Sequence, residues 1–217
     1  LSDTENDNLA IGYQAMTTDT AGGTQNIALG NYALDALTSG DNNIAIGYAA
    51  GGAITTGGSN TLIGRYAGIT ATTVSGNTAV GDNALKINVA EYNTAVGAFA
   101  LDSNTTGTTN TAVGYGALDA NSTAEYNTGI GAYALVAATT GSYNTALGRS
   151  AGLAITTGTR NIAIGVDTLK AVTTGVDNTA VGTNAASATT GDNNVAVGKS
   201  ALNANTSGNQ NVAIGKL

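Results

Sequence analysis

The side chains that usually carry out catalysis are nearly absent from this sequence. Its 217 residues include no His and no Cys, and only 7 basic and 14 acidic residues. The nucleophile systems that pair Ser or Cys with His are therefore excluded. A pair of carboxylates is the remaining catalytic possibility, as in the hydrolysis of glycosides.

Asp102 and Asp119 are the best candidates for such a pair, because they occupy equivalent positions in two adjacent repeats of the sequence. Stacked repeats would place them about 5 Å apart. An active site should, however, make one repeat unlike the others, and none stands out. We therefore interpret the two carboxylates as a solubilising row and predict that the chain is not an enzyme. Acidic residues are also too sparse to supply the six to eight oxygens of a Ca²⁺ site, so we expect no metal and no cofactor.

A second candidate site is a row of large side chains that each directly precede a repeated Asn. Its members, which we call the Tyr–Arg stripe, are Tyr92, Tyr126, Tyr143 and Arg160. Stacking would align them on one surface, and exposed aromatic faces suit sugar rings of a cell-surface glycan or receptor. The competing interpretation is that these Tyr cover a corner of the fold or pack on a neighbouring rod.

Pairs of Thr form a third regular feature. They recur at Thr55-Thr56, Thr72-Thr73, Thr105-Thr106, Thr139-Thr140, Thr156-Thr157 and Thr173-Thr174. A regular Thr array on a flat face is similar to that of ice-binding proteins. The alternative is a polar edge built from residues that favour β-structure. Val89-Ala90 and Ser122 interrupt the array, which weighs against ice binding.

These features are positioned by an internal repeat of about 17 residues. The word Asn-x-Ala-(Ile/Val/Leu)-Gly recurs thirteen times, with Leu62 and Gly129 in place of Ala in two copies. It begins at Asn8, Asn26, Asn43, Asn60, Asn77, Asn93, Asn110, Asn127, Asn144, Asn161, Asn178, Asn194 and Asn211. We number each repeat from this Asn, so that Gly is at position 5. The structural residues that we expect to define the coil are Asn43, Gly47, Asn60, Gly64, Asn77, Gly81, Asn93, Gly97, Asn110 and Gly114.

A repeat of this length predicts a β-solenoid. It is too short for a pair of helices, and its β-branched first half, bounded by Asn and Gly, is typical of a short strand. A second short strand could run through positions 8 to 13. Stacked coils would let Asn form an amide ladder, and Gly would serve a tight turn. We predict one all-β domain over residues 1–217: a parallel β-solenoid of about 12–13 coils, cut from a longer fibre protein.

The faces of the predicted strand suggest that the rod associates with copies of itself. Positions 2 and 4 lie on one face and positions 3 and 5 on the other, and neither face is charged. One coil can bury only one face, so the other needs a partner. The net charge of −7 argues against nucleic acid, and no apolar run approaches the length of a membrane span.

The repeat resembles the head repeats of trimeric autotransporter adhesins and related repeats of bacteriophage tail fibres. The segment Asn43-Ile44-Ala45-Ile46-Gly47-Tyr48-Ala49-Ala50 carries the resemblance, and every repeat shares its core word. This chain departs from the adhesin repeat by an added Thr-Thr-Gly segment. The resemblance implies a homotrimeric, extracellular rod on a virion tail or bacterial surface that supports host attachment. A filament formed by end-to-end stacking is the alternative.

Overall fold

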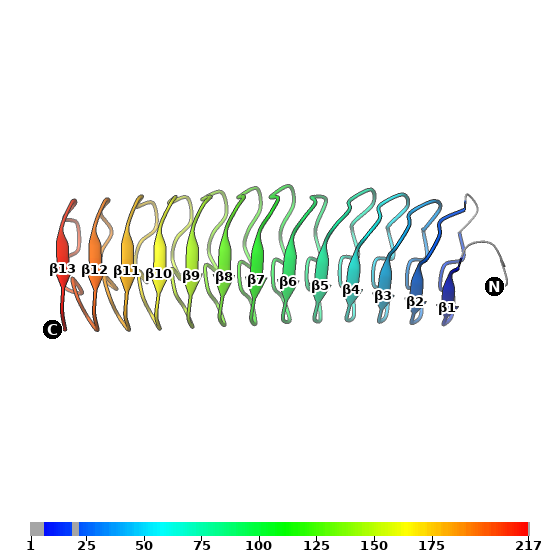
Figure 1. Cartoon of the computed structure of the whole chain (residues 1–217), viewed down its shortest axis with the longest axis horizontal. Coiled ribbons are helices and arrows are strands. Elements are labelled where there is room, and N and C mark those ends of the chain that lie inside the picture. The colour runs from blue at the N-terminus through cyan, green and yellow to red at the C-terminus, as the bar shows by residue number, and fades with distance from the viewer. Residues whose placement is uncertain (1–6, 19–21, 217) are drawn as a thin grey trace.

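The computed structural model describes residues 7–18 and 22–216, and these form a single stack of coils (Figure 1). No helix occurs among them, and hence none that could cross a membrane. Each coil contributes one strand of three residues. The strands are β1 Leu9–Ile11, β2 Ile27–Leu29, β3 Ile44–Ile46, β4 Thr61–Ile63, β5 Thr78–Val80, β6 Thr94–Val96, β7 Thr111–Val113, β8 Thr128–Ile130, β9 Thr145–Leu147, β10 Ile162–Ile164, β11 Thr179–Val181, β12 Val195–Val197 and β13 Val212–Ile214.

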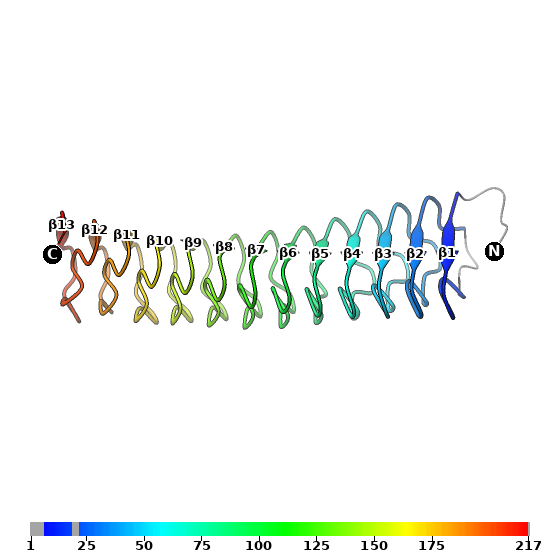
Figure 2. The same cartoon turned by 90° about the horizontal axis from the view of Figure 1, so that it is seen from below.

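The strands form one parallel sheet whose order is the order of the sequence. Equivalent positions pair across every step; for example, Ala95 of β6 pairs with Ala112 of β7. The two described ends of the chain therefore lie at opposite ends of a rod (Figure 1), with the strands along one side and the turns along the other (Figure 2). The predicted parallel β-solenoid with a repeat of about 17 residues is confirmed.

The sheet keeps position 3 inside and positions 2 and 4 outside. In β7 the side chain of Ala112 is buried, whereas Thr111 and Val113 are half-buried on the outer face. The rest of the core comes from positions 8, 9 and 12, represented in this coil by Ala117, Leu118 and Asn121. Each coil encloses only a narrow interior, so mostly small side chains fill it.

A large side chain in one coil can fill the space that small residues leave in the same coil and in the coil beside it. Leu62 occupies position 3, where most coils have Ala, and its coil and the preceding one have Gly at position 9. A Cβ atom added to Gly51 or Gly68 would lie 2.8 Å from a δ-carbon of Leu62. Leu62 therefore fills space that Leu side chains at position 9 fill in other coils.

The expected second strand at positions 8 to 13 is absent from the described coils, which have turns there. The reason is a left-handed backbone at positions 7 and 9. In one coil Phe99 has φ 59° and Leu101 has φ 52°. Ala100, which lies between them, has a negative φ. A β-strand requires φ to stay negative. The alternating signs turn the chain tightly and point Leu101 into the core.

Asn at position 1 forms an unbroken ladder from Asn8 to Asn211. In the ninth coil, Oδ1 of Asn144 accepts the backbone N–H of Asn161 at 3.0 Å, and its Nδ2 donates to the carbonyl of Gly158 at 2.8 Å. Oδ1 also accepts from Nδ2 of Asn161 at 3.1 Å. Each buried Asn thus satisfies main-chain groups at the junction between two coils.

A second ladder, which sequence reasoning missed, lies at position 12 of three coils. Nδ2 of Asn104 donates to Oδ1 of Asn88 at 2.8 Å, and Nδ2 of Asn121 donates to Oδ1 of Asn104 at 2.6 Å. Hydrophobic residues occupy this position in most other coils, so the three Asn replace apolar packing with amide bonds.

Gly at position 5 is required by space and by backbone conformation. Gly47 has φ 134°, and a Cβ on it would lie 2.5 Å from the carbonyl oxygen of Gly64 in the next coil. The same contact recurs at each described coil that has a successor. This position ends the strand and lets successive turns approach each other.

We predict that Asn144→Ala destabilises the rod far more than Thr145→Ala. The first change leaves the buried Asn161 N–H and Gly158 carbonyl without these partners, at about 1–3 kcal/mol for each group. Thr145 is exposed on the outer face, so its loss should cost within about 0.5 kcal/mol. Urea unfolding followed by far-UV circular dichroism measures both. Equal losses would contradict the structural role of the ladder.

Candidate functional site

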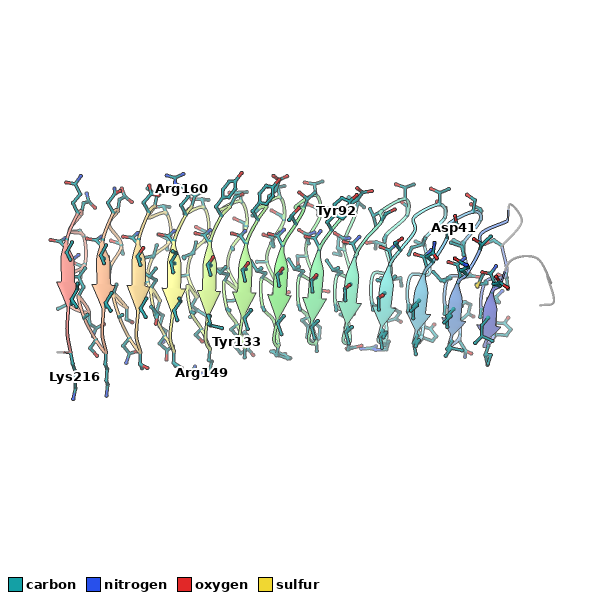
Figure 3. The ribbon with its side chains drawn as sticks, in the orientation of Figure 1. Asp41, Tyr92, Tyr133, Arg149, Arg160 and Lys216 are labelled. Carbon is teal, nitrogen blue, oxygen red and sulfur yellow. The ribbon has the colours of Figure 1, made fainter. Side chains whose placement is uncertain are left out.

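The Tyr–Arg stripe lies along one edge of the sheet. Figure 3 shows Tyr92 and Arg160 on this edge, away from the edge that carries Tyr133 and Arg149. The backbone is left-handed at all four stripe residues, with φ between 57° and 63°. That conformation turns the chain into the next strand and leaves the side chains exposed, with 63% of Tyr92 and 58% of Tyr143 accessible.

The stripe is not a uniform row of free rings. Tyr126 and Tyr143 stack in parallel, with ring centroids 5.1 Å apart and planes at 9°, so each covers one face of the other. Thr109 separates them from Tyr92, whose ring lies beside Gly76. The stripe therefore offers one stacked pair and one separate ring.

Arg160 ends the stripe in an ion pair. Its Nε lies 2.7 Å from Oδ1 of Asp177 and its Nη2 lies 2.8 Å from Oδ2. The hydrogen bonds from the guanidinium hold the pKa of Asp177 below its usual value. Both groups are on the surface and screened by water, so the pair orients Arg160 without storing much energy.

The opposite edge carries a longer set of rings that sequence reasoning missed. We call it the aromatic column, and it consists of two runs, Tyr13-Tyr32-Tyr48-Tyr66 and Phe99-Tyr115-Tyr133. Neighbouring rings meet edge to face, with centroids 5.3–5.7 Å apart and planes at 72–83°. The signal in the sequence is an alternation: Tyr13 and Tyr48 are at position 6, whereas Tyr32 and Tyr66 are at position 7.

A polar group lies between the two runs of the column. Arg65 binds Asp82 through two hydrogen bonds, Nε–Oδ1 at 2.8 Å and Nη2–Oδ2 at 3.0 Å. Nδ2 of Asn83 also donates to Oδ2 of Asp82 at 2.9 Å, and the guanidinium carbon of Arg65 lies 5.0 Å from the Tyr66 ring centroid. Arg65 keeps the pKa of Asp82 below its ordinary range. The column is thus one platform with a neutral, hydrogen-bonding centre.

Asp102 and Asp119 do lie at the same position of adjacent coils, on the turn side of the rod. Partial burial raises the pKa of both carboxyls, and the charge of Asp102 raises that of Asp119 further. The charge of Lys86 acts in the opposite direction on Asp102 and lowers its pKa. Oδ1 of Asp102 is buried and accepts no hydrogen bond. No group of three His, Cys, Asp or Glu that could bind a metal occurs among the described residues.

The Thr pairs are divided between structure and surface. In four of the six pairs the first Thr donates its hydroxyl to a backbone carbonyl of the next coil, as in Thr55 to Thr72 at 3.2 Å and Thr156 to Thr173 at 3.1 Å. The second Thr, such as Thr56 or Thr157, is exposed. The exposed part of the array is therefore the second Thr of each pair together with Thr72 and Thr173.

We predict that Asp102→Asn with Asp119→Asn stabilises the rod at neutral pH. Their raised pKa means that the folded state holds protons that the unfolded chain has released, so stability falls as pH rises through the folded pKa. The thermal midpoint of the variant should exceed that of the parent at pH 7, and the difference should shrink at about pH 3, where Asp is protonated. Asn203 already occupies the same position in another coil.

The control for this prediction is Asp177→Asn, for which the sign reverses. The pKa of Asp177 is lowered in the folded rod, so its contribution is present at neutral pH and is lost on acidification. A gain in the double variant that is the same at both pH values would contradict the electrostatic explanation.

Comparison with known proteins adds no assignment to these surfaces. No protein-family model, no curated protein and no solved structure matches the chain.

Proposed function

We propose that the chain is a segment of a trimeric surface fibre, on a phage tail or a bacterial cell, that presents a binding surface along a stiff rod. The observation that carries this proposal is the outer face of the sheet. At positions 2 and 4 of all thirteen coils it contains only Ile, Leu, Val and Thr, with no charged residue. Leu147 is 46% exposed there and Ile130 is 38% exposed.

The size of this face suits lateral association. Thirteen strands at about 4.8 Å spacing extend about 58 Å, and a strand of three residues is about 10 Å wide. The resulting area of roughly 600 Å² per copy approaches the ~800 Å² that each partner contributes to a stable interface. The face has no charge, and its row of aliphatic side chains at position 4 is unbroken, so burial against like faces is favoured.

The rest of the rod supports display. Each coil bonds only to its two neighbours, so length is added without changing the cross-section. The stripe and the column lie at the two edges of the face, and would stay accessible when three faces meet. Three copies of each surface row would raise avidity for a repetitive cell surface. The resemblance to adhesin heads and tail-fibre repeats supports the same role.

We predict that the purified chain sediments as a trimer, with three times its mass of 21.1 kDa. Val113→Lys with Leu147→Lys puts two charges on the outer face of β7 and β9, and should give a folded monomer because burying unpaired charge is costly. Thr106→Lys, on the exposed turn, is the matched control and should remain trimeric. Analytical ultracentrifugation separates these results. A monomeric parent at micromolar concentration would overturn the proposal.

The Tyr–Arg stripe gives the proposed rod a first binding surface. Tyr126→Ala with Tyr143→Ala removes the stacked pair and should reduce attachment of host cells or glycans to immobilised protein several-fold. Attachment equal to that of the parent would reject the stripe as a contact surface and would leave the trimer unaffected.

A further inference from the structure

We propose that the aromatic column, from Tyr13 to Tyr133, binds a linear, uncharged polysaccharide of β-1,4-linked sugars that lies along the rod. The inference deepens the proposed role as a surface-binding rod by naming a ligand class, and it places that ligand on the edge opposite the Tyr–Arg stripe. It rests on ring geometry, on exposure and on the charge of the surrounding residues.

The column is built as a surface and not as core. Tyr13 is 64% exposed, Tyr115 is 50% exposed, and Tyr48 and Tyr133 are each 44% exposed. Edge-to-face contact with both neighbours fixes the middle rings, Tyr48 and Tyr115, before any ligand arrives. Rings that are ordered in advance lose little entropy on binding, which favours affinity.

The column has a repeat of two coils, because the rings alternate between positions 6 and 7. Tyr13 and Tyr48 are equivalent by position, as are Tyr32 and Tyr66. Two coils correspond to about 10 Å. A β-1,4-linked chain also repeats every two sugars, since each ring is flipped relative to the last, and its disaccharide length is close to two coils. The C–H faces of its sugars would therefore meet equivalent aromatic rings at regular steps.

The polar centre of the column suits sugar hydroxyls. Arg65, Asp82 and Asn83 form a connected set that carries no net charge and contains both donors and acceptors. It interrupts the rings at one coil between Tyr66 and Phe99. An anionic polymer would need clustered basic residues, whereas the bidentate contact to Asp82 already neutralises Arg65. A neutral polyhydroxyl chain matches this surface.

The same geometry argues against a proline-rich peptide, the other extended ligand that aromatic surfaces bind. Such peptides insert prolines into grooves between aromatic rings. Here consecutive centroids are 5.3–5.7 Å apart and the rings touch edge to face, so no slot separates them. A ligand can lie on the column but cannot enter it.

The test is native affinity electrophoresis of the full chain through gels that contain one soluble polysaccharide each. Hydroxyethyl cellulose represents the β-1,4 class, laminarin a β-1,3 chain and soluble starch an α-1,4 chain. Binding of a polyproline peptide is measured separately by tyrosine fluorescence, since the chain has no Trp. We expect retardation in the cellulose derivative. Tyr48→Ala with Tyr115→Ala should raise the dissociation constant at least tenfold, and Thr56→Ala with Thr106→Ala should leave it unchanged.

One conservative variant and two contrary results complete the test of the aromatic column. Tyr48→Phe with Tyr115→Phe keeps the rings, so near-normal binding by this variant supports the column even where the Ala variant unfolds. Loss of binding only in the Tyr126→Ala, Tyr143→Ala variant overturns the column and leaves the rod proposal standing. No retardation of the parent, or binding of polyproline alone, also overturns the column. The sedimentation mass of the same samples tests the proposed trimer independently of polysaccharide binding.

Discussion

The whole structure depends on one constraint: each residue lies directly on its own copy in the next coil. Parallel pairing in register sets this, with Ala95 on Ala112 and Gly47 against Gly64. An interior position must therefore tolerate a column of the same residue at about 4.8 Å spacing. Asn meets this requirement because its amide both donates and accepts, and the ladder from Asn8 to Asn211 follows. Ala and Gly meet it because they are small.

The same constraint makes packing a property of neighbouring coils together. Gly51 and Gly68 leave space that one Leu62 fills, so a large residue in one coil permits small ones in the coils beside it. Asn88, Asn104 and Asn121 at position 12 also act together, since Asn104 bonds to both of the others. The repeat thus conserves the volume and the bonding of the stack, while any single coil is free to depart from the consensus.

The stacking direction was predictable from the sequence, and the path of the chain within a coil was only partly so. The spacing of Asn and Gly predicts the strand, its parallel partners and the 17-residue coil. The expected strand at positions 8 to 13 was wrong because Leu101 and its equivalents have positive φ, which Leu rarely adopts and its identity does not signal. The aromatic column gives no signal at a single repeat position, because its rings alternate between positions 6 and 7, whereas every residue of the Tyr–Arg stripe directly precedes the repeated Asn.

Stacking also explains why the chain carries so little charge and what kind of partner such a rod can bind. Like charges at the same position of adjacent coils would lie about 5 Å apart and would repel by about 1 kcal/mol even in water. Partial burial raises the pKa of Asp119, and the charge of Asp102 on the preceding coil raises it further. The ion pairs Arg65–Asp82 and Arg160–Asp177 show the solution, which is opposite charges on adjacent coils. A long row of one charge is therefore disfavoured, whereas rows of Tyr, Thr and aliphatic residues are not. Specific binding along such a rod must then rely on shape, ring contacts and hydroxyl groups repeated at the spacing of the coils.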